Sequence, residues 1–310
     1  MIKIGTLGFS PGNGHPFSFS AIVNGYEADA FPDEWAGIRN YLEARKPEEI
    51  GFGGRAKVTH CWMPDANMAR TLQAACRIDN VVYEPHDMRN EVDAVMILRD
   101  DWDSHMPLAM PFLQAGLKVF IDKPLTASKA ELAAFMPYLE SGQLMSCSGL
   151  RYARELDPLR QSRERFGELK LVRAAVVNDW TRYGVHMLEA AMSALDLKPI
   201  AVARNLAPHD SLSVHLEGGA CLSIDALGWR PVCFLLDVFG SGTGDGMGLI
   251  ESYKISDNFS AFRRTVSAFL DQVETGRPAV DPAATKLVMD TLRAGLAASP
   301  GKGALKVGEV

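Results

Sequence analysis

The chain has 310 residues, of which 47% are hydrophobic and 23% are charged, and its formal net charge is -6 at pH 7. This composition excludes a disordered or fibrous protein, and an acidic balance without a basic run argues against a nucleic-acid partner. Because a single core stops growing at about 250–300 residues, we expect two domains.

The first half of the chain alternates strand-like and helix-like segments. Strands are expected where short apolar runs end in glycine, proline or polar residues, at 2–7, 56–62, 81–83, 93–98, 118–121 and 144–150. Helices are expected between them, at 17–24, 33–44, 66–77, 105–115 and 128–140, the last with a capping box of Ser128 and Glu131. Such repeated units predict a parallel sheet with helices on both faces.

Ligands of open parallel sheets bind at the carboxyl ends of the strands. Five segments should therefore come together there: 8–15, 62–65, 99–105, 122–124 and 151–152. The candidate cofactor-binding residues are Gly8, Phe9, Ser10, Gly12, Gly14, His15, Trp62, Asp65, His105, Asp122, Lys123 and Pro124. The candidates for contact with a substrate at this edge are Arg151 and Tyr152.

The turn after the first strand departs from the dinucleotide-binding pattern G-x-G-x-x-G. Gly8, Gly12 and Gly14 are spaced four and two residues apart, and Pro11 lies between them. Glycines here would let the backbone approach a pyrophosphate at a helix N-terminus. An ordinary glycine-rich surface loop is the alternative interpretation.

The second strand lacks the acid that usually grips the adenosine ribose at its end. Met63 stands at that position, and Asp65 follows two residues later. Asp65 could reach the ribose or cap the next helix, and we favour the cap.

Lys123 stands at the tip of a strand in the turn Asp122-Lys123-Pro124. The proline disfavours a helical conformation of Lys123. Beside a nicotinamide cation such a lysine could transfer a proton or stabilise an oxyanion. The alternative, which the spacing alone favours, is a surface lysine paired with Asp122.

A divalent metal site is a weaker interpretation of the loop after the 93–98 strand, which carries Asp100, Asp101, Asp103 and His105. Carboxylates in such a loop are more often solvated or bonded to the backbone, so we predict no metal.

The second half of the chain changes character. Strand-like segments at 169–178, 201–205, 211–217, 220–227 and 232–239 follow one another with short turns, which predicts a mainly antiparallel sheet. One helix, 185–195, interrupts them, and a helical pair, 259–275 and 283–298, closes the chain. The glycine-rich loop 240–248 is expected to be a lid or a subunit contact.

The five cysteines are odd in number and form no C-x-x-C pair, which indicates reduced thiols and a cytoplasmic protein. The first residues lack the pattern of a signal peptide. The apolar runs are far shorter than the ~20 residues of a membrane span.

An ordered set of motifs resembles the Gfo/Idh/MocA family, the relatives of glucose–fructose oxidoreductase and inositol dehydrogenase. The 93–98 strand, Asp103-Ser-His105 and the segment from Leu113 to Asp122-Lys123-Pro124 resemble the region around the family's E-K-P turn. Further matches are Gly149 to Arg154, Phe166-Gly167-Glu168, Gly184-Val-His186 to Glu189, and Glu274-Thr-Gly276-Arg277-Pro278.

The resemblance implies an α/β fold, with an N-terminal Rossmann-type parallel sheet and a C-terminal α+β domain whose open-faced, mainly antiparallel sheet mediates homo-oligomers. The expected domains are 1–124 for the dinucleotide, with 125–150 completing its sheet, 151–290 for the substrate and oligomerisation, and a tail at 291–310. NAD or NADP would be the cofactor, and a polyol, sugar or similar hydroxy or oxo compound the substrate.

Two catalytic residues follow from the resemblance. Lys123 matches the lysine that contacts substrate and nicotinamide ribose, and His186 matches the acid–base histidine. The family usually has an aspartate four residues before that histidine, where this chain has Arg182. Arg182 could hold an anionic group of the substrate, and Tyr183 is a further substrate candidate. A binding or scaffold protein that kept the fold and lost the reaction is the alternative.

Overall fold

The computed structural model describes residues 1–244 and 248–310 and divides the chain into two compact units. The first unit holds residues 1–126, 133–146 and 262–282, and the second holds 127–132, 147–261 and 283–310. Part of the loop predicted at 240–248 therefore lies outside the described residues.

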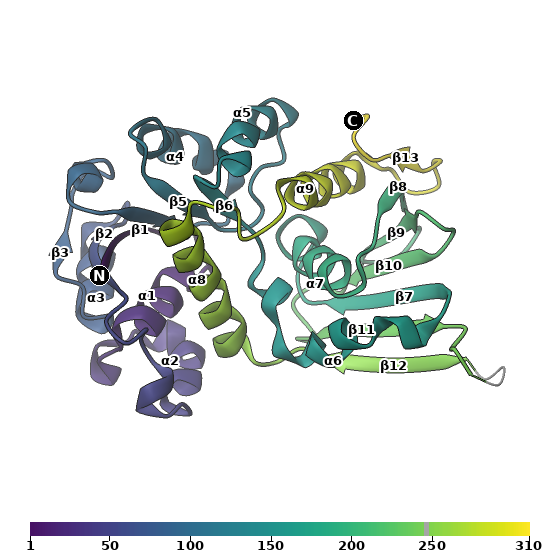
Figure 1. The fold of residues 1–310 in the computed structure, drawn as a ribbon, viewed down its shortest axis with the longest axis horizontal. Coiled ribbons are helices and arrows are strands. Elements are labelled where there is room, and N and C mark those ends of the chain that lie inside the picture. Colours follow the sequence, from purple (N-terminus) through teal and green to yellow (C-terminus); the bar gives the residue numbers. More distant parts are fainter. Residues whose placement is uncertain (245–247) are drawn as a thin grey trace. The chain divides into compact units, whose positions relative to one another are not determined.

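The first unit contains a six-stranded, all-parallel sheet, which confirms the predicted Rossmann-type architecture (Figure 1). Its order is β3-β2-β1-β4-β5-β6. The strands are β1 (Ile2–Leu7), β2 (Ala56–Trp62), β3 (Asn80–Val81), β4 (Ala94–Ile97), β5 (Lys118–Ile121) and β6 (Leu144–Ser146). The strand order reverses between β1 and β4, where sheets of this type bind their ligands.

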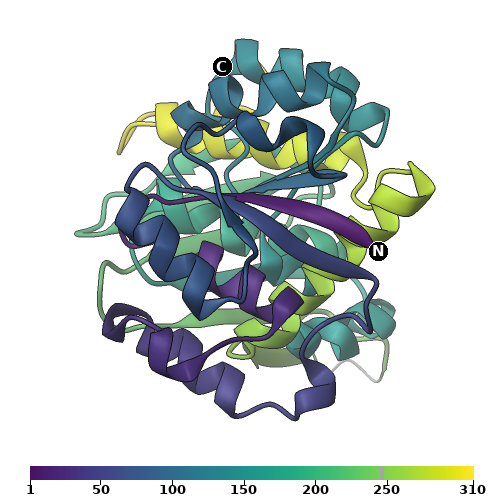
Figure 2. The same cartoon turned by 90° about the vertical axis from the view of Figure 1, so that its left-hand side faces the viewer.

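Helices cover both faces of this sheet, with α4 and α5 on one face and α1 and α8 on the other (Figures 1 and 2). The helices are α1 (His15–Asn24), α2 (Ala36–Glu43), α3 (Ala66–Ala75), α4 (His105–Gln114), α5 (Lys129–Glu140) and α8 (Asn258–Thr275). Gly116 ends the α4 segment with a φ of 86°, and the Glu131 N–H donates to Ser128 Oγ at 3.3 Å, as the predicted cap requires.

The unit boundaries differ from the predicted domains, because α8 belongs largely to the first unit. Its aromatic side chains explain why: Phe262 lies 5.1 Å from Phe19, and Phe269 lies 5.8 Å from Phe120, measured between ring centroids. The predicted tail at 291–310 belongs to the second unit and contains the end of α9 (Pro282–Ala297) and β13 (Leu305–Lys306).

The connection between α1 and β2 carries extra helical turns. The predicted helix at 33–44 forms as the 3-10 turn Asp33–Trp35 followed by the shorter α2. Trp35 stacks on Phe17 with 6.2 Å between ring centroids, and a Cβ at Gly14 would collide with the Trp35 and Ile38 side chains. The inserted segment therefore packs on the N-terminus of α1.

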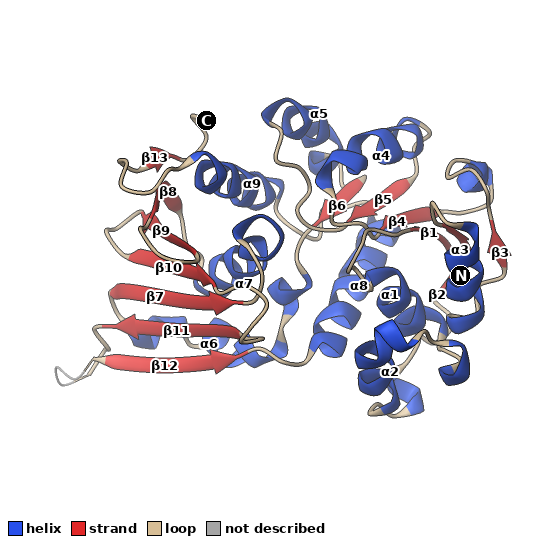
Figure 3. Cartoon of the chain, turned by 180° about the vertical axis from the view of Figure 1, so that it is seen from behind, coloured by secondary structure: helices blue, strands red, loops and turns tan. Residues whose placement is uncertain are grey.

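The second unit contains a seven-stranded sheet in the order β12-β11-β7-β10-β9-β8-β13 (Figure 3). Its other strands are β7 (Leu169–Val176), β8 (Pro199–Arg204), β9 (Asp210–Leu216), β10 (Cys221–Ala226), β11 (Phe234–Gly240) and β12 (Leu249–Lys254). Every neighbouring pair is antiparallel except β7 with β10, so the predicted sheet is confirmed as mainly antiparallel. Sequence patterns did not predict β12 or β13.

One face of this sheet packs against helices, and it buries Val172, Ala174 and Val176 of β7. The helices of this unit are α6 (Asp157–Gln161), α7 (Val185–Leu195) and α9. Over the two described ranges, no helix covers the opposite face in Figure 3. No helix in those ranges is long and apolar enough to cross a membrane.

A buried tryptophan ties α9 to the turn that precedes α7. The Trp180 indole N–H donates to the Leu292 carbonyl at 3.1 Å, and the side chain is 1% exposed. A Cβ at either Gly184 or Gly295 would collide with the indole ring. Both glycines are therefore needed for this close approach.

Candidate active site

A cluster of polar side chains, all buried except the partly exposed His15, lies at the carboxyl ends of β1, β4 and β5 in the first unit. We call it the carboxyl-edge cluster, and it comprises Ser10, Asn13, His15, Asp100, Asp122 and Lys123. Three of the predicted segments, 8–15, 99–105 and 122–124, thus meet as expected. The segment 62–65 adjoins them, since the Gly8 N–H donates to the Trp62 carbonyl at 3.0 Å.

Asp122 has three partners within the cluster. Its Oδ2 lies 2.6 Å from His15 Nδ1 and accepts from the Asn13 amide at 3.2 Å, and its Oδ1 accepts from the Lys123 N–H at 2.8 Å. Burial alone would raise the pKa of Asp122, but His15 and Lys123 together hold it well below its ordinary value. Asp122 is therefore an ionised, fixed carboxylate.

Lys123 is buried, with 3% of its surface exposed, and pairs with another acid. Its Nζ lies 3.8 Å from Asp100 Oδ2, while Ser10 Oγ donates to Asp100 Oδ1 at 2.5 Å. The interpretation of Lys123 as a surface lysine is therefore wrong. The ion pair ties the glycine-rich turn and the end of β4 to the lysine after β5.

The three glycines of the first turn have different surroundings. A Cβ at Gly8 would collide with Pro16, and one at Gly14 would collide with Trp35, so both serve close packing. Gly12 has a φ of 79° and nothing within 4 Å of where a Cβ would lie. Its open backbone is the part of the turn that a phosphate group could approach.

The end of β2 offers no acid to a ribose. Met63 is buried, with 3% of its surface exposed, and Asp65 caps α3 by accepting from the Asn67 N–H at 2.7 Å. The favoured interpretation of Asp65 as an N-cap is confirmed. The Trp62 indole N–H donates to the Tyr83 carbonyl at 3.2 Å.

The acidic loop after β4 does not form a metal site. Asp101 pairs with Arg99, and Asp100 bonds to Ser10. Both ring nitrogens of the buried His105 lie 2.9 Å from backbone carbonyls, those of Leu125 and Arg99. Among residues 1–244 and 248–310, no group of three His, Cys, Asp or Glu side chains is arranged to hold a metal ion.

The second unit holds a second cluster of side chains, around the N-terminus of α7. We call it the His186 cluster, and it comprises Ser148, Arg151, Tyr183, His186, Glu189 and Phe234. His186 is 6% exposed, and its Nδ1 lies 2.6 Å from Ser148 Oγ. The rings of Tyr183 and Phe234 stand 5.3 and 6.1 Å from the imidazole centroid.

A π-helical turn, Trp180–Gly184, leads into α7 and sets the position of the histidine. The Asp179 carboxylate caps this turn by accepting from the Arg182 backbone N–H at 2.9 Å. Asp179 is the nearest acid that precedes His186 in the sequence, and this bond gives it a structural role. Single π-helical turns of this kind are frequent at functional sites.

Glu189 and Arg151 form the ion pair of the His186 cluster. Glu189 Oε2 lies 2.9 Å from Arg151 Nη1, and the glutamate is 1% exposed. Burial raises the pKa of Glu189, while Arg151 and the Ser148 backbone N–H oppose that rise. Burial also raises the pKa of the adjacent Tyr152 phenol far above its usual range.

Sequence analysis missed four members of these clusters and gave a fifth another role. Asn13, Ser148, Glu189 and Phe234 were not predicted, and Asp100 was considered only as a metal ligand. Asn13 lies within the glycine-rich turn, and Glu189 follows His186 by three residues, which places both on one side of α7. Ser148 carries no signal in the sequence beyond its place before a turn.

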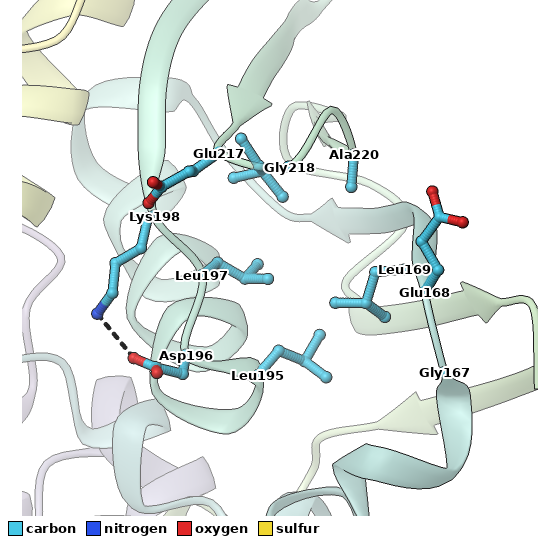
Figure 4. A pocket seen from close by; sticks show the side chains of 11 residues that line it. Gly167, Glu168, Leu169, Leu195, Asp196, Leu197, Lys198, Glu217, Gly218 and Ala220 are labelled. Carbon is cyan, nitrogen blue, oxygen red and sulfur yellow. Dashed lines mark hydrogen bonds and ion pairs between the residues drawn. The ribbon is translucent and has the colours of Figure 1, made fainter. Parts of the chain in front are cut away.

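A cavity of about 370 Å³ lies in the second unit, as Figure 4 shows. It is lined by residues 167–169, 195–198, 216–218 and 220. They come from the start of β7, the end of α7 with the residues that follow it, and the turn between β9 and β10, whereas His186 lies at the start of α7. The cavity contains none of the predicted site residues, so it is separate from the His186 cluster.

Comparison with solved structures reveals the same fold along the whole chain. A probable dehydrogenase from Thermotoga maritima matches with a TM-score of 0.74, 14% identity and 100% of both chains covered. A myo-inositol 2-dehydrogenase from Lactobacillus plantarum matches with a TM-score of 0.75, 13% identity and 99% of both chains covered. At these identities the likeness shows the fold.

A third match is a scyllo-inositol dehydrogenase from Lactobacillus casei, solved with bound NAD(H) and scyllo-inositol. Its TM-score is 0.73 at 13% identity, with 100% of both chains covered. No curated protein matches the chain. Residues 38–147 match the family model GFO_IDH_MocA, described as an oxidoreductase family with an NAD-binding Rossmann fold. Residues 38–147 thus match the model of the Gfo/Idh/MocA oxidoreductases, and over its whole length the chain has the fold of the inositol dehydrogenases it resembles.

Proposed function

We propose that the protein is an NAD(P)-dependent dehydrogenase or reductase that moves a hydride between nicotinamide and a small sugar, polyol or other hydroxy or oxo compound. Lys123 and His186 handle the reacting oxygen and its proton. The observation that carries the proposal is the buried Lys123, held against Asp100 at the carboxyl end of β5. A buried, paired lysine at the ligand-binding edge of a parallel sheet is positioned to act on a bound ligand.

The carboxyl-edge cluster would hold the nicotinamide half of the cofactor. The open backbone at Gly12 would face the pyrophosphate, and Lys123 would face the nicotinamide ribose. The cofactor supplies or accepts the hydride. Because Met63 replaces an acid at the end of β2, no carboxylate there would repel the 2′-phosphate of NADP, and we expect weak discrimination between NAD and NADP.

The His186 cluster would bind the substrate. His186 would contact the reacting oxygen, and Arg151, Tyr152, Arg182 and Tyr183 would contact the remaining polar groups. Hydroxyl-rich rings such as the inositols of the matched dehydrogenases suit these donors and the aromatic wall of Tyr183 and Phe234. Arg182 would favour a substrate that also carries an anionic group.

Calorimetric titration with NAD+, NADH, NADP+ and NADPH, followed by a turnover screen with polyols and oxo-polyols, tests the proposal. Lys123→Ala should lower turnover by about 10²- to 10⁴-fold, the range of proton-transfer catalysis. Lys118→Ala is the matched control, because Lys118 begins the same strand and donates to the Gly142 carbonyl. Full turnover by Lys123→Ala would overturn the mechanism.

A second candidate function is a binding or scaffold protein with the same fold and no reaction. Two observations favour it: Trp35 covers the Gly14 end of the turn, and Asp65 is engaged as a cap. The same titrations separate the candidates, because absence of binding of all four nucleotides would support the scaffold and exclude the dehydrogenase.

We further propose that the uncovered face of the second sheet binds a second copy of the chain. The strand registers give this face an apolar row of Ile250, Phe239, Leu171 and Cys221, with Ile250 63% exposed. The next row places Arg173 beside Asp237, so two copies related by a two-fold axis can pair arginine with aspartate.

Light scattering of the purified protein tests the assembly. Arg173→Glu should shift the protein toward the monomer, whereas Lys170→Glu, on the same strand but on its other side, should not. A monomeric wild-type protein at high concentration would contradict the proposal.

A further inference from the structure

The hydroxyl of Ser148 is placed to decide which nitrogen of His186 carries the proton. Ser148 is fully buried, and its Oγ accepts a hydrogen bond from the Leu150 N–H at 3.1 Å. The same oxygen lies 2.6 Å from His186 Nδ1. One lone pair of the hydroxyl is therefore occupied by the backbone, and its proton still needs an acceptor.

Nδ1 of His186 is that acceptor. Within residues 1–244 and 248–310, the side chain of Ser148 bonds only to the Leu150 N–H and to this nitrogen. A buried hydroxyl proton left without an acceptor would cost about 1–3 kcal/mol. We infer that Ser148 donates to Nδ1 and so fixes the neutral His186 ring as the tautomer that carries its proton on Nε2.

This tautomer differs in its consequences from the one that a carboxylate partner imposes. A carboxylate can only accept, so it keeps a proton on Nδ1 and leaves Nε2 free to act as a base. A donating hydroxyl reverses the two nitrogens. The nearest acid before His186, Asp179, caps its own turn, and the nearest acid after it, Glu189, pairs with Arg151.

The inference rests on the proposed function for its chemical meaning. Neutral His186 would offer an N–H to the substrate oxygen, and Lys123, which pairs with Asp100, would be a second donor. Two donors suit a carbonyl oxygen, so the substrate class is a ketone or aldehyde that is reduced. The hydride from NAD(P)H would add to the carbonyl carbon as the C=O π bond breaks, and the Lys123 ammonium would give a proton to the oxygen and become an amine. Ser148 is thus a positioning residue that acts through His186.

Nitrogen-15 spectra of the histidine side chains in the cofactor-free protein test the inference without any substrate. At mildly alkaline pH, where imidazole is neutral, His186 should show a protonated Nε2 and an unprotonated Nδ1. The signals are assigned by their loss in His186→Gln. A neutral ring protonated mainly at Nδ1 would overturn the inference, whether or not the protein binds a nucleotide.

Three variants separate a specific effect from a general loss of structure. Ser148→Ala should shift the neutral ring toward a mixture of both tautomers, and Ser148→Thr, which keeps the hydroxyl, should restore the wild-type spectrum. Ser193→Ala is the matched control, because Ser193 lies on the same helix as His186 and its hydroxyl donates to the Ala190 carbonyl at 3.3 Å. An unchanged His186 spectrum in Ser148→Ala would refute the role of the hydroxyl, and the wild-type spectrum decides the tautomer even if that variant does not fold.

Discussion

The two polar clusters compensate for the burial of their polar groups in different ways. In the carboxyl-edge cluster, two buried carboxylates face a lysine and a histidine, so charge is balanced against charge. In the His186 cluster, the histidine touches a hydroxyl and two aromatic rings, while the charges of Arg151 and Glu189 satisfy each other.

This difference predicts which substitutions each cluster tolerates without a large loss of stability. Removing one charge from the first cluster leaves its partner buried in a medium of low dielectric constant, which is costly. Removing the hydroxyl from the second leaves no buried charge behind. We therefore expect the loss of a charged partner in the first cluster to lower stability more than the loss of the Ser148 hydroxyl in the second.

Asp100→Ala should produce the largest effect. It removes the carboxylate that faces the buried Lys123 ammonium, and loss of one partner of a buried pair costs about 3–5 kcal/mol of unfolding free energy. Urea denaturation measures the change. Asp101→Ala is the control, since the side chain of Asp101 is 35% exposed and such pairs contribute about 0–1 kcal/mol. Equal losses in both variants would contradict the comparison.

Acidification should weaken the first cluster through Asp122. Its pKa in the folded protein lies below its ordinary value near 3.9, so its stabilising effect is complete above that value. The effect is lost as the pH falls from about 4 toward the lower pKa of the folded state. Urea midpoints at a series of pH values should fall less steeply for Asp122→Asn than for the wild type, and parallel curves would argue against this.

Gly14→Ala should cost about 1–3 kcal/mol, because the added methyl group collides with the Trp35 ring. Trp35→Ala in the same chain provides the room, so the double variant should lose less than the sum of the two single variants. If the losses of unfolding free energy, measured by thermal or urea unfolding, were additive, the Trp35 indole would not lie against Gly14.

Ser148→Ala should have the smallest effect on stability, about 1 kcal/mol, because it removes a cap from the Leu150 N–H and leaves no charge unpaired. Urea denaturation compares it directly with Asp100→Ala. A loss as large as that of Asp100→Ala would remove the distinction between the two clusters.

The fold was predictable from the sequence because its main signals are periodic. Alternating strand and helix segments predicted the parallel sheet, and short strands with tight turns predicted the antiparallel one. The assignment of α8 to the first unit was not predictable. The sequence of an amphipathic helix reveals its apolar face, but not the surface that this face covers. β13 is only two residues long, too short for any period to appear.

The partners within the sites were harder to predict. Spacing pairs Lys123 with Asp122, but the Asp122 carboxylate bonds to His15 while the lysine pairs with Asp100. Successive side chains of an extended segment point to opposite sides, which explains why neighbours in sequence have different partners here. The hydrogen bond between Ser148 and His186 joins residues that are 38 positions apart, and no local sequence pattern predicts it.

The close packing of Gly184 and Gly295 against the Trp180 ring affects how the protein folds during synthesis on the ribosome. The indole bonds to a carbonyl 112 residues later in the chain, and its turn leads directly into the helix that carries His186. During translation, this turn cannot reach its final packing until α9 has emerged. The His186 cluster should therefore be among the last parts of the protein to mature, long after the strands of the first sheet have been made.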